Sequence, residues 1–498
     1  MTIYYVNSAT GSDDNNGTGL KSAFATLSKV ESLQLKPGDS VLLAKGSVFN
    51  EQLDIKFSGA LGAPIKFGSY GTGAAPVIHS AGDGIHSLYA TNIVIENIKI
   101  SNAGGAAIYG GNVSNWTVRN VEVDKSGVSG KSGSVTFRTG ENITIENSKI
   151  SGVHGDGVWI EKINGVKLLN NTITNSHGPL ADGVQMNDSS NILIHGNHID
   201  QTNANSPKGV LTLIRPVNAV VEDNVLTGGG FGISAQAGKT VAIRGNDISG
   251  FHGYSWSFAV ALGETGAARD YDISGNHIHD GPWGVVVTAP IGSPSYARTN
   301  INVHNNTFDD LSGAALKVDR PASGSFHDNT VESGTTATNI SPAIIDAHTF
   351  TVSNNHIVAN VEATTLAAAD VKTAAVTDAA ADPAVVAVHD NLKILSDNGA
   401  PHHGNLLEND SSDDGTLSLR RFGNETVGKH GLTLTGDYGD IHVDRDGNYA
   451  YTLDETKLPD GHSGHVSENF SYGITDATGH HSDTDMLTVF VHLDSLLS

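Results

Sequence analysis

Residues 192–200 read ILIHGNHID, residues 241–249 read VAIRGNDIS, and residues 271–279 read YDISGNHIH. In each segment apolar and polar residues alternate up to a short turn, and another apolar residue follows the turn. Alternation of this kind predicts a β-strand with one buried face, and Gly or Asn at the turn tolerates left-handed backbone angles. The pattern returns as IENIKI at 95–100, ITIENSKI at 143–150, LLNNTIT at 168–174, INVHNNTF at 301–308 and TVSNNHIV at 351–358.

This internal repeat has the period of a short coil. Successive turn asparagines are 22 to 30 residues apart, whereas a propeller blade or a helical repeat needs a longer unit. The period therefore predicts an all-β solenoid whose turns stack at about 4.8 Å. We expect an internal ladder of asparagine side chains with a structural role, made of Asn97, Asn120, Asn147, Asn171, Asn197, Asn224, Asn246, Asn276, Asn306, Asn329 and Asn355.

These coils resemble the parallel β-helix repeats of carbohydrate-active proteins, a group that holds polysaccharide lyases, C5-epimerases and polygalacturonase-like hydrolases. The stretch from Tyr4 (YYVNSATGSDDNNGT) to Gly71 (FGSYG) resembles the opening of many such proteins. The resemblance implies a right-handed parallel β-helix as a catalytic domain over residues 1–360. Residues 23–35 predict an amphipathic helix that caps the open end of the solenoid, with its apolar side formed by Phe24, Leu27, Val30, Leu33 and Leu35.

The pattern changes after Asn360. Residues 361–400 are rich in alanine and predict a linker or a last irregular coil. Residues 401–498 alternate strand-like runs with Asp-Gly turns, which predicts a small β-sandwich. From GNLLEND at 404–410 to Asp476, this part resembles the cadherin-like (VCBS-type) repeat of bacterial surface proteins. Four aspartates are candidate Ca²⁺ ligands or plain turn residues: Asp410, Asp413, Asp414 and Asp476.

Composition narrows the partners and the compartment. The 498 residues carry a formal net charge of −24 and no cysteine, so we expect no nucleic-acid partner, no disulfides and no thiolate chemistry. We find no apolar run that would span a bilayer and no N-terminal signal peptide of the usual sort. An acidic chain with a cadherin-like repeat and the ending FVHLDSLLS resembles substrates of one-step (type I) bacterial secretion, so we expect an extracellular protein. The oligomeric state stays open.

One column of the repeat predicts chemistry. We expect Val135, Val158, Val184, Val210 and Ile233 at equivalent inward positions, with Asp156, Asp182 and Lys208 two residues ahead of the middle three. Two carboxylates stacked about 5 Å apart repel by several kcal/mol at an effective dielectric near 20. Lys208, a bound Ca²⁺ ion or a shared proton would offset that repulsion. The alternative is that an Asp before Gly is only a turn residue.

Around this column we expect an active cleft on the outer face. The candidate catalytic residues are Asp156, Asp182, Lys208, His154, His177 and Arg215, and the two aspartates are also candidate metal ligands. Trp159 should point outward and offer a sugar ring an apolar face. The candidate substrate-binding residues are Arg138, Trp159, Glu161, Lys162, Gln185, His252 and Tyr254.

Three reactions fit these residue types. In β-elimination a base removes the proton next to a uronate carboxyl group, which cationic groups neutralise. In hydrolysis the paired aspartates serve as acid and carboxylate, and C5-epimerisation shares the first step of elimination. The Asp-Pro-His motif of mannuronan epimerases and the Asn-Thr-Asp and Arg-x-Lys motifs of polygalacturonases are absent. We therefore expect a secreted lyase acting on a uronate-containing polysaccharide, with a non-catalytic adhesin as the alternative outside enzymes.

Overall fold

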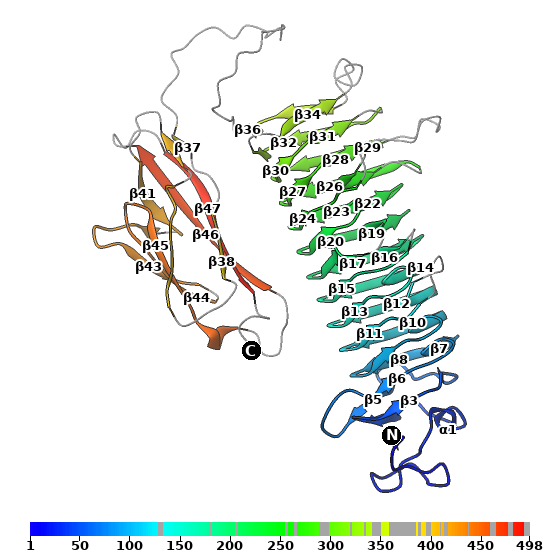
Figure 1. Ribbon diagram of the computed structural model, residues 1–498. Coiled ribbons are helices and arrows are strands. Elements are labelled where there is room, and N and C mark those ends of the chain that lie inside the picture. Colours follow the sequence, from blue (N-terminus) through cyan, green and yellow to red (C-terminus); the bar gives the residue numbers. More distant parts are fainter. Residues whose placement is uncertain are drawn as a thin grey trace. The chain divides into compact units, whose positions relative to one another are not determined.

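A computed structural model of the chain divides into two compact units, Met1–Glu362 and Ala363–Ser498 (Figure 1). The structure describes residues 1–127, 133–178, 181–204, 208–253, 257–262, 266–287, 298–318, 321–332, 335–340, 350–357, 385–386, 390–394, 400–408, 410–412, 417–423, 425–436, 438–458, 465–476 and 482–492. Within these ranges, no helix reaches the length and apolarity that crossing a bilayer requires.

The first unit is a parallel β-solenoid, as the repeat predicts. Its described strands form a 23-stranded and a 13-stranded sheet, and Figure 1 shows them stacked coil upon coil. The smaller sheet consists of β3 (Val48–Phe49), β6 (Val77–Ile78), β9 (Lys99–Ser101), β11 (Glu122–Asp124), β13 (Lys149–Ser151), β15 (Thr172–Thr174), β18 (His198–Gln201), β21 (Val225–Gly228), β24 (Asp247–Ser249), β27 (His277–Gly281), β30 (Thr307–Leu311), β33 (Thr330–Val331) and β36 (His356–Ile357).

The larger sheet contains two strand positions per coil. In three coils both positions lie on one long strand: β10 (Ile108–Arg119), β12 (Val135–Glu146) and β14 (Val158–Leu169). Later coils divide it, so that β16 (Asp182–Asn187) and β17 (Ser190–His195) both pair with β14. The remaining strands are β1 (Ile3–Val6), β2 (Ser40–Ala44), β4 (Leu53–Asp54), β5 (Ile65–Tyr70), β7 (Ile85–Leu88), β8 (Thr91–Glu96), β19 (Gly209–Ile214), β20 (Val217–Glu222), β22 (Ile233–Gln236), β23 (Lys239–Arg244), β25 (Phe258–Leu262), β26 (Ala268–Ser274), β28 (Trp283–Val287), β29 (Arg298–His304), β31 (Ala314–Val318), β32 (Gly324–His327), β34 (Thr336–Ile340) and β35 (Phe350–Ser353).

One continuous apolar core fills the solenoid from Val6 to Phe350. Alternation along each strand builds it: Ile192 and Ile194 of β17 are buried while Leu193 between them is only half-buried, and Ile199 of β18 is buried between exposed His198 and half-buried Asp200. Because each coil contacts only its neighbours, the core lengthens with every repeat. Outward side chains are left to differ from coil to coil.

A ladder of buried asparagines runs along the turn between the two sheets. Asn224 is representative: its Oδ1 accepts from the backbone N–H and the Nδ2 of Asn197, and its own Nδ2 donates to Oδ1 of Asn246. The Nδ2 group also donates to backbone carbonyl groups. The hydrogen-bonded members are Asn171, Asn197, Asn224, Asn246, Asn276, Asn306, Asn329 and Asn355.

The three earliest predicted members were placed wrongly by one residue. Asn97, Asn120 and Asn147 have positive φ angles of 57°, 51° and 49°, so they occupy the left-handed turn position. The ladder position after them belongs to Ile98, Val121 and Ser148. Asparagine suits both positions, which is why the sequence pattern merged them.

The helix near the N-terminus is much shorter than predicted. Only Leu27–Glu31 (α1) is helical, rather than residues 23–35. Thr26 caps it by accepting from Lys29 N–H, and the Glu51 carboxylate accepts from the first two N–H groups of the helix. Leu27 and Val30 are buried in the solenoid core. Its role in covering the end of the solenoid stays a prediction.

The second unit holds a five-stranded and a four-stranded sheet around a core that includes Leu419, Tyr451, Tyr472 and Val489. The first sheet consists of β38 (Asp390–Ile394), β41 (Leu417–Phe422), β42 (Glu425–Thr426), β46 (His465–Asp476) and β47 (Ser482–His492). The second consists of β39 (His402–Asn405), β43 (Leu432–Thr435), β44 (Gly439–Val443) and β45 (Asn448–Leu453). A further pair joins β37 (Val385–Val386) to β40 (Ser411–Ser412), and η1 is a 3₁₀ turn at Glu455–Lys457.

The boundary of this unit differs from the predicted one. Strand β38 pairs with β47 although it lies in the predicted linker, 361–400. Residues 361–384 lie outside the described residues, as do residues 493–498 of the predicted export signal, which spans 490–498. The cadherin-like β-sandwich stays a prediction.

Candidate active site

Two aspartates stack on adjacent coils, as predicted. Val158 is in register with Val184, so Asp156 before β14 lies beside Asp182 at the start of β16. A Cβ atom added to Gly183 would lie 2.6 Å from Ile199 in the solenoid core. Because side chains alternate along a strand, Asp182 leaves the strand on the opposite, outer side. The pair therefore belongs to the outer wall of the solenoid and not to its core.

The predicted register of Lys208 was wrong by one residue. Asp182 pairs with Gly209, and Val184 pairs with Leu211 instead of Val210. This coil is therefore one residue longer than the spacing of 26 suggested, and Lys208 precedes the column. Its side chain nevertheless reaches the site, with Nζ 3.9 Å from Oδ2 of Asp182.

The pair does not line an open cleft, which corrects the expectation of a cleft on the outer face. Asp156 is 3% exposed and Asp182 is fully buried. Along the same column, Gly209 leaves space that the Phe231 ring fills, and Phe231 stacks on Phe258 at 5.1 Å between ring centroids. These rings form a small apolar cluster separate from the solenoid core. The Lys208 side chain, 36% exposed, connects the pair to solvent.

Burial and mutual repulsion keep a proton on this pair. Burial, followed by the charge of Asp182, raises the pKa of Asp156 to about 8, although the Asp182 N–H donates to its Oδ1 at 2.7 Å. Burial also raises the pKa of Asp182 to about 6, against the opposing effects of Lys208, the Thr212 hydroxyl and Gly209. Neither carboxylate oxygen of Asp182 has a well-aligned hydrogen bond among the described residues. At neutral pH the pair thus holds one proton and one negative charge.

The two predicted histidines also stack on adjacent coils. His154 and His177 are joined by a parallel bridge, and their ring centroids lie 6.2 Å apart. Burial, and then the charge of His154, lowers the pKa of His177. His177 is therefore neutral at neutral pH and can accept a proton, whereas His154 is exposed. His154 lies two residues before Asp156 in the chain, and His177 lies five residues before Asp182.

Trp159 lies on the outer side of β14, three residues after Asp156. It is half-buried rather than exposed, and the Arg138 guanidinium sits 5.7 Å from its ring centroid. Arg138 also pairs with Glu161 at 3.3 Å. The Nε1 group of Trp159 is buried and has no hydrogen-bond partner among the described residues. An unsatisfied indole N–H suits a ligand oxygen.

The predicted cationic residues Arg215 and Lys162 lie toward the ends of the outer-wall strands that are opposite to Asp156 and Asp182. Arg215 donates to Asp188 at 2.5 and 2.8 Å, and Asp188 follows Asp182 by six residues, or about 20 Å of extended chain. Lys162 pairs with Glu161 at 3.4 Å. Arg215 is thus a partner of Asp188 and no neighbour of the buried aspartates, contrary to the prediction. Gln185, between the two ends, donates to Asn187.

The remaining predicted residues either have other partners or lie outside the described residues. His252 lies three coils beyond Asp182, and its Nε2 atom is 3.4 Å from Oδ1 of Asp280. Tyr254, Asp413 and Asp414 lie outside the described residues, and only the backbone of Asp476 is described. Asp410 accepts from the Tyr472 hydroxyl at 3.3 Å.

The buried aspartates fit a proton better than Ca²⁺. Calcium takes six to eight oxygen ligands, whereas this pair already faces the Lys208 ammonium and accepts a backbone N–H. Among the described residues, the donor set is therefore too small for calcium, and its charge is already partly neutralised. We assign no step at this pair to calcium.

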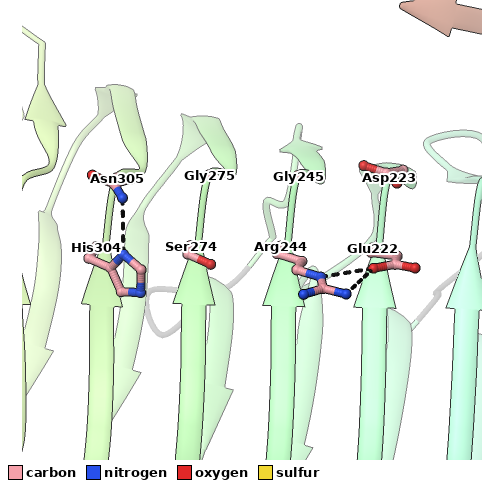
Figure 2. Close-up of a pocket in the computed structure, with 8 residues that line it drawn as sticks. All are labelled: Glu222, Asp223, Arg244, Gly245, Ser274, Gly275, His304 and Asn305. Atoms are coloured by element: carbon pink, nitrogen blue, oxygen red, sulfur yellow. Dashed lines mark hydrogen bonds and ion pairs between the residues drawn. The ribbon is translucent and has the colours of Figure 1, made fainter.

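A surface pocket of about 360 Å³ lies elsewhere, along the row of turns that precedes the asparagine ladder (Figure 2). Figure 2 shows Arg244 bonded to Glu222, with the short Ser274 leaving a hollow before His304. Sequence reasoning missed this row because its residue types change from coil to coil. The pocket is lined by Glu222, Asp223, Arg244, Gly245, Ser274, Gly275, His304 and Asn305.

Two groups of metal-ligand type also escaped the prediction. Asp247, His277 and His279 form one, and His195, Glu222 and Asp223 form the other, each with its donor atoms within 4.8 Å of one another. Alternating His-x-His in β27 is visible in the sequence, but the aspartate contributed by the preceding coil is visible only once the register is known.

Comparisons with known proteins agree with this fold. Residues 106–278 match the family model of the right-handed β-helix region. Over 92 residues the chain is 42% identical to the calcium-binding lectin RapA2 of Rhizobium johnstonii, which covers 17% of this chain and 39% of the lectin. Over 87 residues it is 47% identical to a lacto-N-biosidase of Bifidobacterium longum, covering 16% of this chain and 5% of that protein. The matches thus span under two fifths of either relative.

Among solved structures, the chain is similar to the GH136 lacto-N-biosidase from Eubacterium ramulus. The TM-score is 0.48 at 17% identity, over 72% of this chain and 68% of that one. It is also similar to a mannuronic-acid-specific polysaccharide family 6 lyase from human gut microbiota, with a TM-score of 0.43 at 14% identity, over 72% and 91% of the two chains. The family match at 106–278 includes both buried aspartates.

Proposed function

We propose that the first unit is an enzyme that hydrolyses a polysaccharide at the Asp156–Asp182 pair. The observation that carries the proposal is a buried pair of carboxyl groups on adjacent coils, where burial and the charge of Asp182 raise the pKa of Asp156 to about 8. Glycoside hydrolysis needs this combination, one carboxylic acid to protonate the leaving oxygen and one carboxylate to act on the sugar. Adjacent coils are about 4.8 Å apart, which fits the short separation of a retaining mechanism.

The two aspartates take different roles because their surroundings differ. Asp156 has the higher pKa and is the general acid. Asp182 faces the Lys208 ammonium at 3.9 Å, which favours its ionised form, so it is the carboxylate. The buried Trp159 N–H, three residues from the acid, is available to a sugar oxygen. Since the pair is buried, substrate entry requires that the side chains around the partly exposed Lys208 move aside.

Elimination is the second candidate, supported by a different observation. His177, five residues before Asp182, has a lowered pKa and is a candidate neutral base. A lyase also needs free cationic groups to neutralise the uronate carboxyl group, but Arg215 is held by Asp188 and Lys208 by Asp182. That engagement makes hydrolysis the better-supported reaction here. Epimerisation shares the first step of elimination and the same requirement.

The test measures two products at once on a panel of acidic and neutral polysaccharides, with Ca²⁺ and with chelator. New reducing ends without ultraviolet absorbance establish hydrolysis. Absorbance from unsaturated uronate ends establishes elimination and overturns our assignment. Binding without either product overturns the enzyme proposal and supports the adhesin.

Matched variants localise the chemistry. Asp156→Asn removes the acid while preserving shape, and Asp188→Asn changes an exposed carboxylate at the other end of the same wall. We expect loss of turnover only in the first. Equal loss in both would contradict the assignment.

We further propose that the protein works outside the cell, with Ca²⁺ bound by the second unit. The similarity of 92 residues to a calcium-binding lectin supports Ca²⁺ binding by the chain, and the candidate aspartates of residues 401–498 are why we assign it to the second unit. Calorimetric titration of the full chain with Ca²⁺, before and after Asp410→Asn, tests it. Unchanged heats in the variant would remove Asp410 from the proposed ligand set.

A further inference from the structure

The outward face of the 13-stranded sheet carries a cluster of imidazole and carboxylate groups that could bind a metal ion and that the proposed reaction does not use. Asp247 begins β24, and His277 and His279 alternate on β27 of the next coil. Asp247 is in register with His277, and Ser249 with His279. Ile248 and Ile278 between them are buried in the core, so the three donors point outward together.

The donors already converge. Oδ1 of Asp247 lies 3.2 Å from Nε2 of His279, and its Oδ2 lies 3.5 Å from Nδ1 of His277. The two imidazole rings stack with centroids 4.2 Å apart. All three donor atoms lie within 4.8 Å of one another. Ligands on a tetrahedral Zn²⁺, each about 2 Å from the ion, are about 3.3 Å apart, so small side-chain rotations suffice.

The charges around this cluster also favour a cation. Asp309 is in register with His279 on the following coil, and Glu332 lies one coil beyond it, bonded through its N–H to Phe308. Among the described residues, the ion pairs of Asp247 involve only histidines. At the other end of the same sheet, Lys99 bridges Glu122 and Asp124. There a lysine supplies the cation, whereas the Asp247 cluster supplies ligands for one.

The second histidine cluster differs in this respect. In His195, Glu222 and Asp223, the Glu222 carboxylate is already held by Arg244 at 2.7 Å. An arginine cannot be deprotonated to make room for a metal ion. This cluster therefore serves as a matched control of similar composition.

We infer that Asp247, His277 and His279 form a binding site for a divalent transition-metal ion of the zinc type. Imidazole nitrogens suit Zn²⁺, Ni²⁺ and Cu²⁺, whereas Ca²⁺ prefers oxygen donors throughout. Asp309 or water completes the coordination. The ion would clip two neighbouring coils together on the wall formed by the 13-stranded sheet, away from the strands that hold Asp156 and Asp182.

The experiment titrates the full chain, stripped of metal, with Zn²⁺ and separately with Ca²⁺ in a calorimeter, and with Co²⁺ by visible absorption. We expect one Zn²⁺ site whose affinity falls at least tenfold in His279→Ala and in Asp247→Asn, with the Co²⁺ band lost in parallel. His195→Ala should retain both signals. Circular dichroism of each variant checks folding, which these outward side chains should not disturb.

Three outcomes would overturn the inference. One is Zn²⁺ binding that is unchanged in the His277→Ala, His279→Ala double variant. Another is a loss of equal size in His195→Ala. The third is the absence of Zn²⁺ binding by the full chain.

Discussion

Two columns of buried polar side chains run along the same solenoid, and they obey opposite rules. In the asparagine ladder, Asn224 is neutral, and its amide oxygen and nitrogen both take part in hydrogen bonds. In the carboxylate column, Asp182 is fully buried, carries no well-aligned side-chain hydrogen bond among the described residues, and faces Asp156 one coil away. Satisfied neutral groups stabilise a fold, whereas strained ionisable groups cost stability and mark functional sites. The difference separates the part that holds the solenoid together from the part that we propose does chemistry.

The largest expected effect is the loss of turnover when a carboxyl group of the column is replaced. Asp156→Asn should lower turnover by a factor of about 10² to 10⁴, the usual contribution of a general acid. The same change removes a strained ionisable group, so the protein should not lose stability. Rates of reducing-end release, measured beside the thermal midpoint, test both halves. A variant that loses activity only because it unfolds would contradict the distinction.

The matching substitution in the asparagine ladder should lower the stability of the fold. Asn224→Ala removes hydrogen bonds to two neighbouring ladder asparagines and leaves buried partners unsatisfied, so we expect a cost of about 2–4 kcal/mol. Denaturant unfolding measures it. Asn355→Ala, at the half-exposed end of the ladder, should cost less. Equal costs at both positions would mean that burial does not control the strength of the ladder.

The pH dependence of stability should differ between the columns. The folded pKa of Asp156 is about 8, above the unfolded value of about 3.9. Between these values the folded state binds more protons, so this contribution is complete below pH ~4 and is lost as pH rises through ~8. The slope reaches about 1.4 kcal/mol per pH unit. The difference between wild type and Asp156→Asn isolates it, and parallel curves would contradict the raised pKa.

A smaller effect comes from the cation beside the pair. Lys208 lowers the pKa of Asp182, so Lys208→Met should raise it and move the acidic limb of the pH–rate profile upward. At neutral pH we expect only a several-fold loss of turnover. An unchanged acidic limb would remove Asp182 from the role of the ionised partner.

The smallest effect should come from the exposed end of the wall. Arg215→Gln breaks the surface pair with Asp188, and such pairs contribute about 0–1 kcal/mol. We expect nearly unchanged stability and turnover, checked by the same assays. A large loss of turnover would restore Arg215 to the active site and contradict its placement.

The same contrast explains what the sequence could reveal. Turn chemistry and alternation repeat in every coil, so segments such as 241–249 and 271–279 predict the solenoid directly. Where an apolar residue replaces the ladder asparagine, as at Ile98, the neighbouring turn asparagine takes its place in the pattern. The register error at Lys208 has a similar cause, because a spacing does not show where an extra residue is accommodated.

The burial of the candidate site could not be predicted from the sequence, for a different reason. Asp156 and Asp182 were predicted to stack, and they do. The apolar cluster of Phe231 and Phe258 continues the column of the two aspartates in later coils. Residues that pack on the outer wall do not repeat with the period of the coils, so the sequence pattern does not reveal them. The Asp247 cluster was missed because its contacts depend on the register between coils of unequal length.

The most direct test is the infrared spectrum of the carboxyl groups at neutral pH. A protonated carboxyl group absorbs in a region separate from carboxylates and amides. The account predicts such a band in the wild type, its loss in Asp156→Asn, and its persistence in Asp188→Asn. A wild-type spectrum without that band would show that both aspartates are ionised, and it would contradict the claim that this column holds the catalytic proton.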